Sequence, residues 1–286
     1  MYNQKLCINT GAVNETDVSK TLTLIKNTGF EAFFTGYADN LKEYRIQADK
    51  LGLEYLFVHA PFGSVEKLWQ DGEEAEKAVN ELLRCNSDCA EIGIELIVLH
   101  AYKGFEPNAG PNETGIKNFK TVIDDAKSKN IRVALENTEG EEYLAALMEA
   151  FKEYDNVGFC WDTGHEQCYN YGKDMTALYG DRLFCTHIND NLGVSRYDGK
   201  TYWTDDLHLL PFDGITDWTD VAKRLNDHAY NGVLTFELVR NSKPNRHEND
   251  FYTKMTDEEY LSQAYNRACR LAALKNRTKR KGAFNE

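Results

Sequence analysis

Short apolar segments alternate with longer amphipathic segments along nearly the whole chain. The apolar segments are near-continuous runs rather than alternating patterns, which is typical of strands that are buried on both faces. They predict eight strands, at Leu6 to Asn9, Ala32 to Thr35, Tyr55 to Ala60, Leu96 to His100, Arg132 to Asn137, Val157 to Thr163, Leu183 to Ile188 and Val233 to Leu238. The amphipathic segments predict helices at Val18 to Thr28, Leu41 to Leu51, Glu73 to Ile92, Ile116 to Lys129, Glu141 to Tyr154, Trp218 to His228 and Asp257 to Asn276.

This alternation predicts an α/β fold, and among α/β folds it favours a single (β/α)8 TIM barrel. A doubly wound open sheet usually carries a Gly-rich phosphate turn after its first strand, and residues 9–12, Asn-Thr-Gly-Ala, are not such a turn. One barrel needs about 250 residues. We therefore expect residues 1–286 to form one domain, with a basic C-terminal tail over about 275–286.

Two connections are longer than a barrel requires. The loop after the fourth strand runs from Ala101 to Asn112, and the loop after the seventh runs from about Asn189 to Thr216. Both leave the C-terminal ends of strands, where barrel enzymes build their active sites. Long loops at that face are typical of lids over a site.

The charge balance argues against a nucleic-acid partner. The 33 basic and 46 acidic residues give a formal net charge of −13, whereas nucleic-acid binding draws most of its affinity from basic groups. The basic cluster at the C-terminus is interpreted as a solvated helix end, because cations there complement the helix dipole. It consists of Lys275, Arg277, Lys279, Arg280 and Lys281.

The sequence predicts neither export nor membrane insertion. Residues 1–7 lack the basic and apolar regions of a secretory signal, and no apolar run approaches the ~20 residues that cross a bilayer. The seven cysteines include no Cys-x-x-Cys pair, and several lie in strand segments where a reduced thiol packs as a small apolar group. We expect a cytoplasmic protein without a membrane partner.

Four predicted strands end in, or next to, a side chain that binds metal ions: Glu136, Asp162, His187 and Glu237. The C-terminal ends of barrel strands meet at one face, so we expect these side chains to converge. Carboxylate and imidazole groups without thiolates suit Mn²⁺, Zn²⁺, Co²⁺ or Mg²⁺. The sequence therefore predicts a divalent-metal site.

A second set of metal-binding residue types falls at the same predicted face: His59, His100, His165, Asp206 and His208. A single histidine at a strand end is more often an imidazole bonded to the backbone. Five histidines and four carboxylates together favour metal binding. The second set is thus a candidate for further metal ligands, and for more than one ion, or for substrate binding.

Short motifs at the strand ends resemble those of a known family. They are Leu135-Glu136-Asn137-Thr138, Trp161-Asp162-Thr163-Gly164-His165, His187-Ile188-Asn189-Asp190 and Phe236-Glu237. In order and spacing they resemble the xylose-isomerase-like barrels, which include sugar phosphate isomerases and epimerases and the endonuclease IV group of apurinic-site nucleases. The resemblance extends from His59 to Glu237 and implies a metal-dependent TIM barrel enzyme.

For the ketose 3-epimerase branch, the resemblance implies that Glu136, Asp162, His187 and Glu237 bind one metal ion. It further implies that Glu136 and Glu237 exchange a proton with the substrate carbon next to a carbonyl, while His165 contacts a substrate oxygen. A cation that stabilises the enediolate and a base already in place make such a weak carbon acid reactive. The chain departs from this branch because the first arginine after His187 is Arg196.

The endonuclease IV branch is the alternative. Its three-zinc site uses ligands from nine positions, and the four strand-tip residues and the second set together resemble all nine. That resemblance implies several ions and hydrolysis of a phosphodiester in abasic DNA. The acidic balance and the absence of a basic stripe in the strand-end loops favour the isomerase or epimerase of a sugar.

Aromatic residues near the predicted site face are candidates for stacking on a sugar: Phe62, Trp69, Tyr102 and Trp203. Loop packing explains them equally well. Lys103 and Lys200 are candidates for contact with a phosphate, and Asn137, Asn189 and Asp190 for orienting the ligands or forming turns. We expect a small sugar as the partner, and the sequence leaves a homo-oligomer open.

Overall fold

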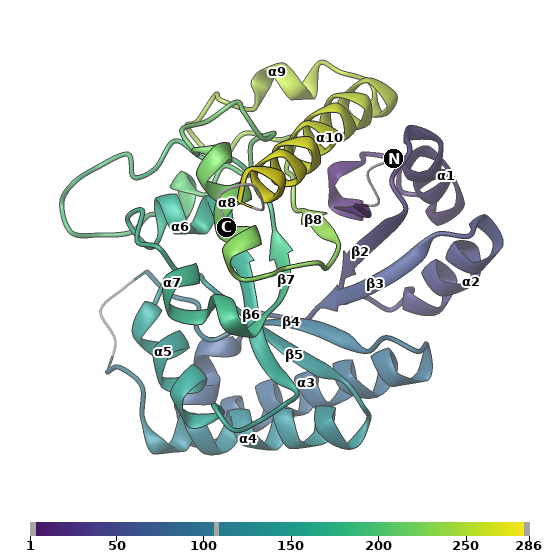
Figure 1. The fold of residues 1–286 in the computed structure, drawn as a ribbon. Coiled ribbons are helices and arrows are strands. Elements are labelled where there is room, and N and C mark those ends of the chain that lie inside the picture. Colours follow the sequence, from purple (N-terminus) through teal and green to yellow (C-terminus); the bar gives the residue numbers. More distant parts are fainter. Residues whose placement is uncertain (1–3, 106–108, 283–286) are drawn as a thin grey trace.

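The computed structural model is a barrel of eight parallel strands with helices around its outside (Figure 1). It describes residues 4–105 and 109–282. The strands are β1 (Leu6–Asn9), β2 (Ala32–Gly36), β3 (Glu54–His59), β4 (Leu96–His100), β5 (Arg132–Glu136), β6 (Val157–Asp162), β7 (Leu183–His187) and β8 (Leu234–Phe236). The predicted single (β/α)8 barrel, with long loops after β4 and β7, is confirmed.

The barrel closes through few contacts. Strands β1 to β7 pair in sequence order and β8 pairs with β1, whereas β7 meets β8 through an isolated bridge between Ile188 and Phe236. There the Ile188 amide donates to the carbonyl of Thr235 at 2.8 Å. Beside this closure, Asn9 and Leu238 exchange two hydrogen bonds of 3.0 Å between side chain and backbone.

Helices connect the strands and cover the barrel. They are α1 (Val18–Thr28), α2 (Leu41–Leu51), α3 (Glu73–Glu91), α4 (Glu113–Ser128), α5 (Glu141–Ala150), α6 (Thr163–Cys168), α7 (Thr176–Tyr179), α8 (Trp218–Asp227), α9 (Asp250–Thr253) and α10 (Asp257–Gly282). Short 3-10 turns are η1 (Thr10–Ala12), η2 (Val65–Trp69), η3 (Gly180–Arg182) and η4 (Trp203–Asp205). None of the helices in the described part of the chain is both long and apolar enough to cross a membrane.

Local sequence signals explain where the helices begin and end. Asp17 caps α1 by accepting a hydrogen bond from the Lys20 amide, and Gly29 ends the helix with a φ of 116°, which glycine adopts readily. Asn112 caps α4 in the same way, by accepting from the Gly115 amide. These residues fix where α1 begins and ends and where α4 begins.

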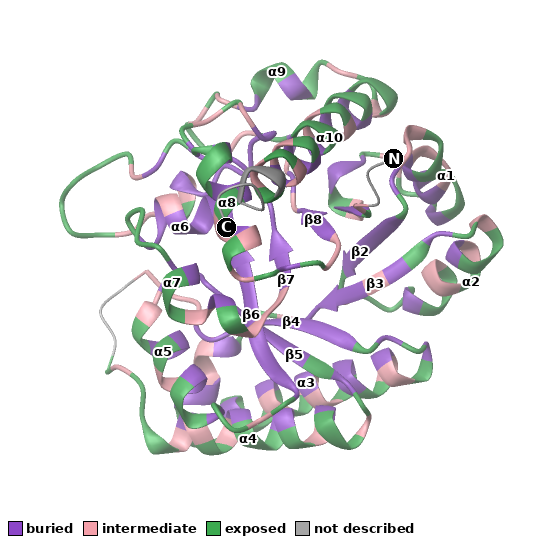
Figure 2. Ribbon diagram, in the orientation of Figure 1, coloured by how far each residue is buried: buried purple, intermediate pink, exposed green. Residues whose placement is uncertain are grey.

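The core has two layers. The strands are mostly buried, with a few exposed residues at their ends, while the helices bury one face and expose the other (Figure 2). The larger layer lies between strands and helices. Alternate strand positions supply a second buried cluster inside the barrel, which includes Phe34, Phe57, Ala134, Cys160 and Cys185. The strand-tip side chains lie next to this inner cluster, and the His187 ring packs against Phe34 and Phe57.

The structure differs from the prediction in a few elements. Between β6 and β7 the chain forms the short helices α6 and α7, which are too brief for a helical period to be visible in the sequence. The last helix was expected to end at Asn276 but continues to Gly282, because the basic residues after Lys275 are good helix formers. Pro107 in the loop after β4 and the final residues 283–286 of the expected tail lie outside the described residues.

Candidate metal centre

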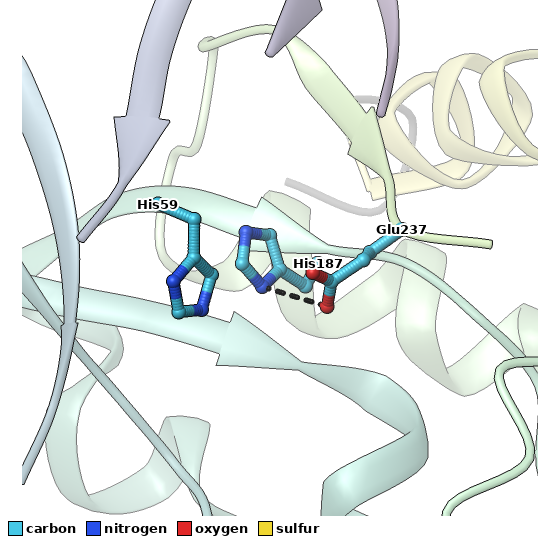
Figure 3. Close-up of side chains that lie close together, drawn as sticks. All are labelled: His59, His187 and Glu237. Carbon is cyan, nitrogen blue, oxygen red and sulfur yellow. Dashed lines mark ion pairs between the residues drawn. The ribbon is translucent and has the colours of Figure 1, made fainter. Parts of the chain in front are cut away.

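The four strand-tip residues converge at the C-terminal end of the barrel. Glu136, Asp162 and His187 end β5, β6 and β7, and Glu237 follows β8 directly. One ligand atom from each lies within 4.8 Å of the others. Figure 3 shows the His187 ring beside the Glu237 carboxylate, which lies 3.2 Å from its Nδ1, with the His59 ring close by.

Glu136 is the centre of this arrangement. Its side chain is fully buried. Oε1 lies 2.9 Å from Nδ1 of His187 and 3.3 Å from Nδ1 of His165. Oε2 faces the other way, at 3.3 Å from Nε2 of His59 and 3.2 Å from Nε2 of His100. One carboxylate thus contacts four imidazoles.

His59, His100 and Glu136 form a nearly equilateral triangle of ligand atoms. The two Nε2 atoms are 3.1 Å apart, and each lies 3.2–3.3 Å from Oε2 of Glu136. Ligands at about 2.0–2.1 Å from a common ion lie roughly 3.0–3.4 Å apart in tetrahedral or octahedral sites. The triangle therefore has the dimensions of three ligands of one ion.

A second cluster lies nearer the long loops and consists of His165, Asp206 and His208. Oδ1 of Asp206 lies 2.9 Å from Nε2 of His208 and 3.5 Å from Nε2 of His165. His208 has a φ of 47°, in the left-handed region that residues other than glycine adopt rarely. Its Nδ1 contacts the carbonyl of Glu237 at 3.0 Å, which holds the ring in this orientation.

Three of the histidine rings are anchored as metal ligands usually are. Nδ1 of His59, His165 and His208 lies 2.9–3.0 Å from the carbonyls of Ala60, Asn137 and Glu237, respectively. A carbonyl accepts only, so each Nδ1 carries the proton and each Nε2 is left to face the cluster. A backbone or carboxylate partner on the far nitrogen is the usual support of a metal-bound imidazole.

Several buried polar atoms of the cluster residues lack a hydrogen-bond partner among the described residues. They are Oε2 of Glu136, Oδ1 of Asp206, Nε2 of His187 and Nδ1 of His100. Buried polar atoms are nearly always paired, and the first two face imidazole nitrogens at ligand spacing. The donor set of imidazoles and carboxylates, its spacing and its unpaired oxygens all fit divalent cations.

The ionisation of the cluster reflects its unusual density of charge. Burial alone would raise the pKa of Glu136, but the imidazoles, with His187 first among them, hold it well below its usual range. The pKa of Glu237 is lowered to about 2 in the same way, against the effect of burial. Burial raises the pKa of Asp162 to about 6. Burial lowers the pKa of His208, but the carboxylates, Asp206 first, raise it to about 9.

The spacing of Asp162 and His165 has a local cause. Asp162 caps α6, and its Oδ1 accepts a hydrogen bond of 2.6 Å from the His165 amide. Its Oδ2 accepts from Nδ2 of Asn189 at 2.8 Å. A Cβ on Gly164 would clash with the Asn189 side chain. The predicted motif Asp-Thr-Gly-His therefore turns two candidate ligands toward the cluster, and Gly164 lets Asn189 orient one of them.

The mouth of the barrel holds a cavity of about 230 Å³. His59, His100, His165, Asp206, His208 and Glu237, all candidate metal ligands, line it. Two lysines also line the cavity, each against an aromatic ring: Lys103 Nζ lies 4.8 Å from the Phe62 ring centre, and Lys243 Nζ lies 5.6 Å from that of Trp203. Lys243 Nζ also lies 3.5 Å from Oδ2 of Asp206. The cavity therefore combines metal-binding groups with two cations and apolar faces.

The structure separates the predicted aromatic residues into two pairs. Phe62 and Trp203 line the cavity. Trp69 and Tyr102 are placed elsewhere: the Trp69 indole donates to the carbonyl of Ala101 at 2.8 Å, and the Tyr102 ring stacks on Tyr143 at 4.2 Å. Both are buried packing residues, so the structure does not support the prediction that they contact substrate.

Sequence reasoning missed four cavity residues: Phe105, Glu139, Tyr169 and Lys243. Glu139 lies three residues after the end of β5, and this position was the one signal in the sequence that could have identified it as a site residue. Tyr169 directly follows α6, a helix that the sequence did not predict. Lys243 lies after β8, outside any motif. Lys200, a predicted phosphate contact, does not line the cavity.

The chain is similar to a known family and to solved structures. The family model described as xylose isomerase-like TIM barrel matches residues 22–255. Among solved structures, an L-ribulose 3-epimerase superimposes with a TM-score of 0.74 at 14% identity, covering 99% of this chain and 98% of that one. At this identity the likeness shows the fold alone.

Two curated relatives match over shorter stretches. An uncharacterized protein y4fM of Sinorhizobium fredii is 30% identical over 141 residues, 43% of this chain and 45% of the relative. A probable endonuclease 4 of Nitratidesulfovibrio vulgaris is 29% identical over 149 residues, 43% of this chain and 51% of the relative. The chain thus spans about half the length of the curated relatives it matches.

Proposed function

The chain belongs to the family of xylose isomerase-like TIM barrels, and from this premise we propose that it is a divalent-metal enzyme that hydrolyses a small phosphoester at a site holding several ions. His59, His100 and Glu136 would hold one ion. His165, Asp206 and His208 would hold another, and Glu136 would share a third with Asp162, His187 and Glu237. Mn²⁺, Zn²⁺, Co²⁺ and Mg²⁺ suit these ligands.

The observation that carries the proposal is the position of Glu136. A base that removes a proton from a substrate carbon must reach the substrate. Glu136 is fully buried and outside the cavity lining, and both of its oxygens face imidazoles. This position supports a role for Glu136 as a ligand shared between metal ions rather than as the base that moves a proton. It therefore favours a hydrolytic reaction over an isomerisation.

The cavity supports an anionic substrate. Divalent ions in such sites polarise substrate oxygens and lower the pKa of coordinated water. Lys103 and Lys243 line the same cavity, and ammonium groups suit the oxygens of a phosphate. Lys243 also lies 3.5 Å from Oδ2 of Asp206, so Lys103 is the stronger candidate for this contact. Phe62 and Trp203 offer apolar faces for the remainder of the substrate.

The size of the cavity and the net charge of −13 favour a small molecule over DNA. A duplex would require a basic surface around the mouth. Cleavage of abasic DNA would indicate a nuclease instead.

A second candidate, an isomerase or epimerase of a sugar, is favoured by Glu237. This carboxylate both lines the cavity and belongs to the group with Glu136, Asp162 and His187, so one ion and one base could suffice. In that case Glu237 would move the proton at the substrate carbon, and His165 would hold a substrate oxygen.

One panel of assays separates the candidates. Protein loaded with Mn²⁺ or Zn²⁺ is offered 4-nitrophenyl phosphate, bis(4-nitrophenyl) phosphate, an oligonucleotide with an abasic site, and ketohexoses in D₂O. Turnover of either phosphate ester that stops on chelation supports the proposal. Deuterium incorporation into a ketose without ester hydrolysis would favour the isomerase instead, and nicking of the oligonucleotide alone would favour the nuclease.

A further inference from the structure

Glu139 is a buried carboxylate that lines the cavity without belonging to the ligand clusters. It lies in the turn between β5 and α5, and 6% of its surface is exposed. No candidate metal group among the described residues includes it. The other two carboxylates of the cavity lining, Asp206 and Glu237, are held by histidines at 2.9 and 3.2 Å.

The backbone around Glu139 fixes its side chain. Oε1 accepts a hydrogen bond of 3.0 Å from the Gly104 amide. A Cβ on Gly104 would clash with the Tyr102 ring, so a glycine is needed for this amide to come close. Gly140, with a φ of 74°, turns the chain directly after Glu139 into α5. Two glycines thus hold this carboxylate at the cavity wall.

The surroundings suit a group that carries a proton. Burial raises the pKa of Glu139, and hydrolytic enzymes commonly use a carboxyl group raised in this way as a general acid. Tyr169 also lines the cavity, but burial raises the pKa of its phenol well above its usual value, which makes it a weaker acid. In the proposed function, Lys103 contacts the charged phosphate of the substrate.

We infer that Glu139 is the general acid that protonates the leaving alcohol of the phosphoester. The oxygen of the attacking water bonds to phosphorus, and the bond from phosphorus to the alcohol oxygen breaks with its electron pair on that oxygen. The proton of Glu139 moves to this oxygen and releases a neutral alcohol. The proton lost by the water returns Glu139 to its acid form through solvent. This assignment rests on the proposed phosphoester hydrolysis.

The test compares two esters of similar size, 4-nitrophenyl phosphate and benzyl phosphate, or the matching diesters if the diester is the form cleaved. A nitrophenolate leaves without a proton, whereas a benzyl alkoxide requires one. In Glu139→Gln we expect hydrolysis of the benzyl ester to fall by about 10²–10⁴-fold and that of the nitrophenyl ester by less than about tenfold. The alkaline decline of the benzyl pH–rate profile should also disappear.

Glutamine separates chemistry from structure because its amide oxygen still accepts from the Gly104 amide. Glu142→Gln, at an exposed position on α5, is the matched control and should leave both rates unchanged. Metal content and Tm of Glu139→Gln should equal those of the wild type. Equal losses on both esters, or none, would overturn the assignment of Glu139 alone. A wild-type enzyme that cleaves neither ester would instead overturn the proposed function, and the assignment with it.

Discussion

Glu136 Oε1 lies 2.9 Å from Nδ1 of His187, although β6 separates the two strands that carry them. Both side chains are fully buried, so the contact is made inside the barrel rather than in solvent. The His187 ring lies flat on Phe34, at 5.1 Å between ring centres. Buried charges that pack against aromatic rings must be neutralised by bound protons or by cations. Metal content and proton release measure which of the two neutralises this cluster.

The metal content should depend unequally on the carboxylates. Glu136 belongs to three of the candidate groups and Asp206 to one. We therefore expect more than one ion per chain in the wild type by elemental analysis, a larger loss in Glu136→Gln, and a smaller loss in Asp206→Asn. A single ion in the wild type, or equal losses in the two variants, would contradict the shared role of Glu136.

Metal binding should release protons at neutral pH. The pKa of His208 is raised to about 9 without metal, so its imidazole is protonated at pH 7, whereas a ligand must be neutral. The apparent affinity for Zn²⁺ should therefore rise with pH and level off above about 9. Calorimetry in two buffers of different ionisation enthalpy measures the protons released. A binding enthalpy independent of the buffer at pH 7 would exclude this exchange.

Asn189→Ala should weaken metal binding with its ligands intact. Nδ2 of Asn189 donates to Asp162 at 2.8 Å, and loss of such a supporting contact typically costs 10–100-fold in metal affinity. Competition with a fluorescent chelator gives the affinity. Asn80→Ala, on an exposed position of α3, is the control and should bind as the wild type does. If Asn189→Ala matched it, Asn189 would be only a turn former.

Gly164→Ala should destabilise the fold. The added methyl group would clash with the Asn189 side chain, and overpacking of this kind costs about 1–3 kcal/mol. For a protein of this size that corresponds to a loss of roughly 2–12 °C in Tm, measured by thermal unfolding of the metal-free protein. At Gly63 a Cβ would meet nothing within 4 Å, so Gly63→Ala should leave Tm nearly unchanged; equal Tm values would argue against the clash.

The strands were predictable because they are buried on both faces and therefore read as unbroken apolar runs. The end of each run also identified the residues that lie at the mouth of the barrel. The buried position of Trp69 was not predictable in this way, because its hydrogen-bond partner, the carbonyl of Ala101, is supplied by another loop. Glu139 resembles the exposed Glu142 in sequence. Only the approach of Gly104, 35 residues away, distinguishes a cavity carboxylate from a helix-start acid.

The narrow closure between β7 and β8 also sets the order in which the protein can assemble. Asn9 and Leu238 are 229 residues apart, and contacts at such separation carry a large loop-closure entropy and form slowly. Glu237 reaches His187 only once the last strand has joined both β1 and β7. The group of Glu136, Asp162, His187 and Glu237 would therefore be completed late in folding, whereas the group of His59, His100 and Glu136 does not involve the last strand. During refolding, uptake of the ion that depends on Glu237 would report the joining of the two ends of the chain.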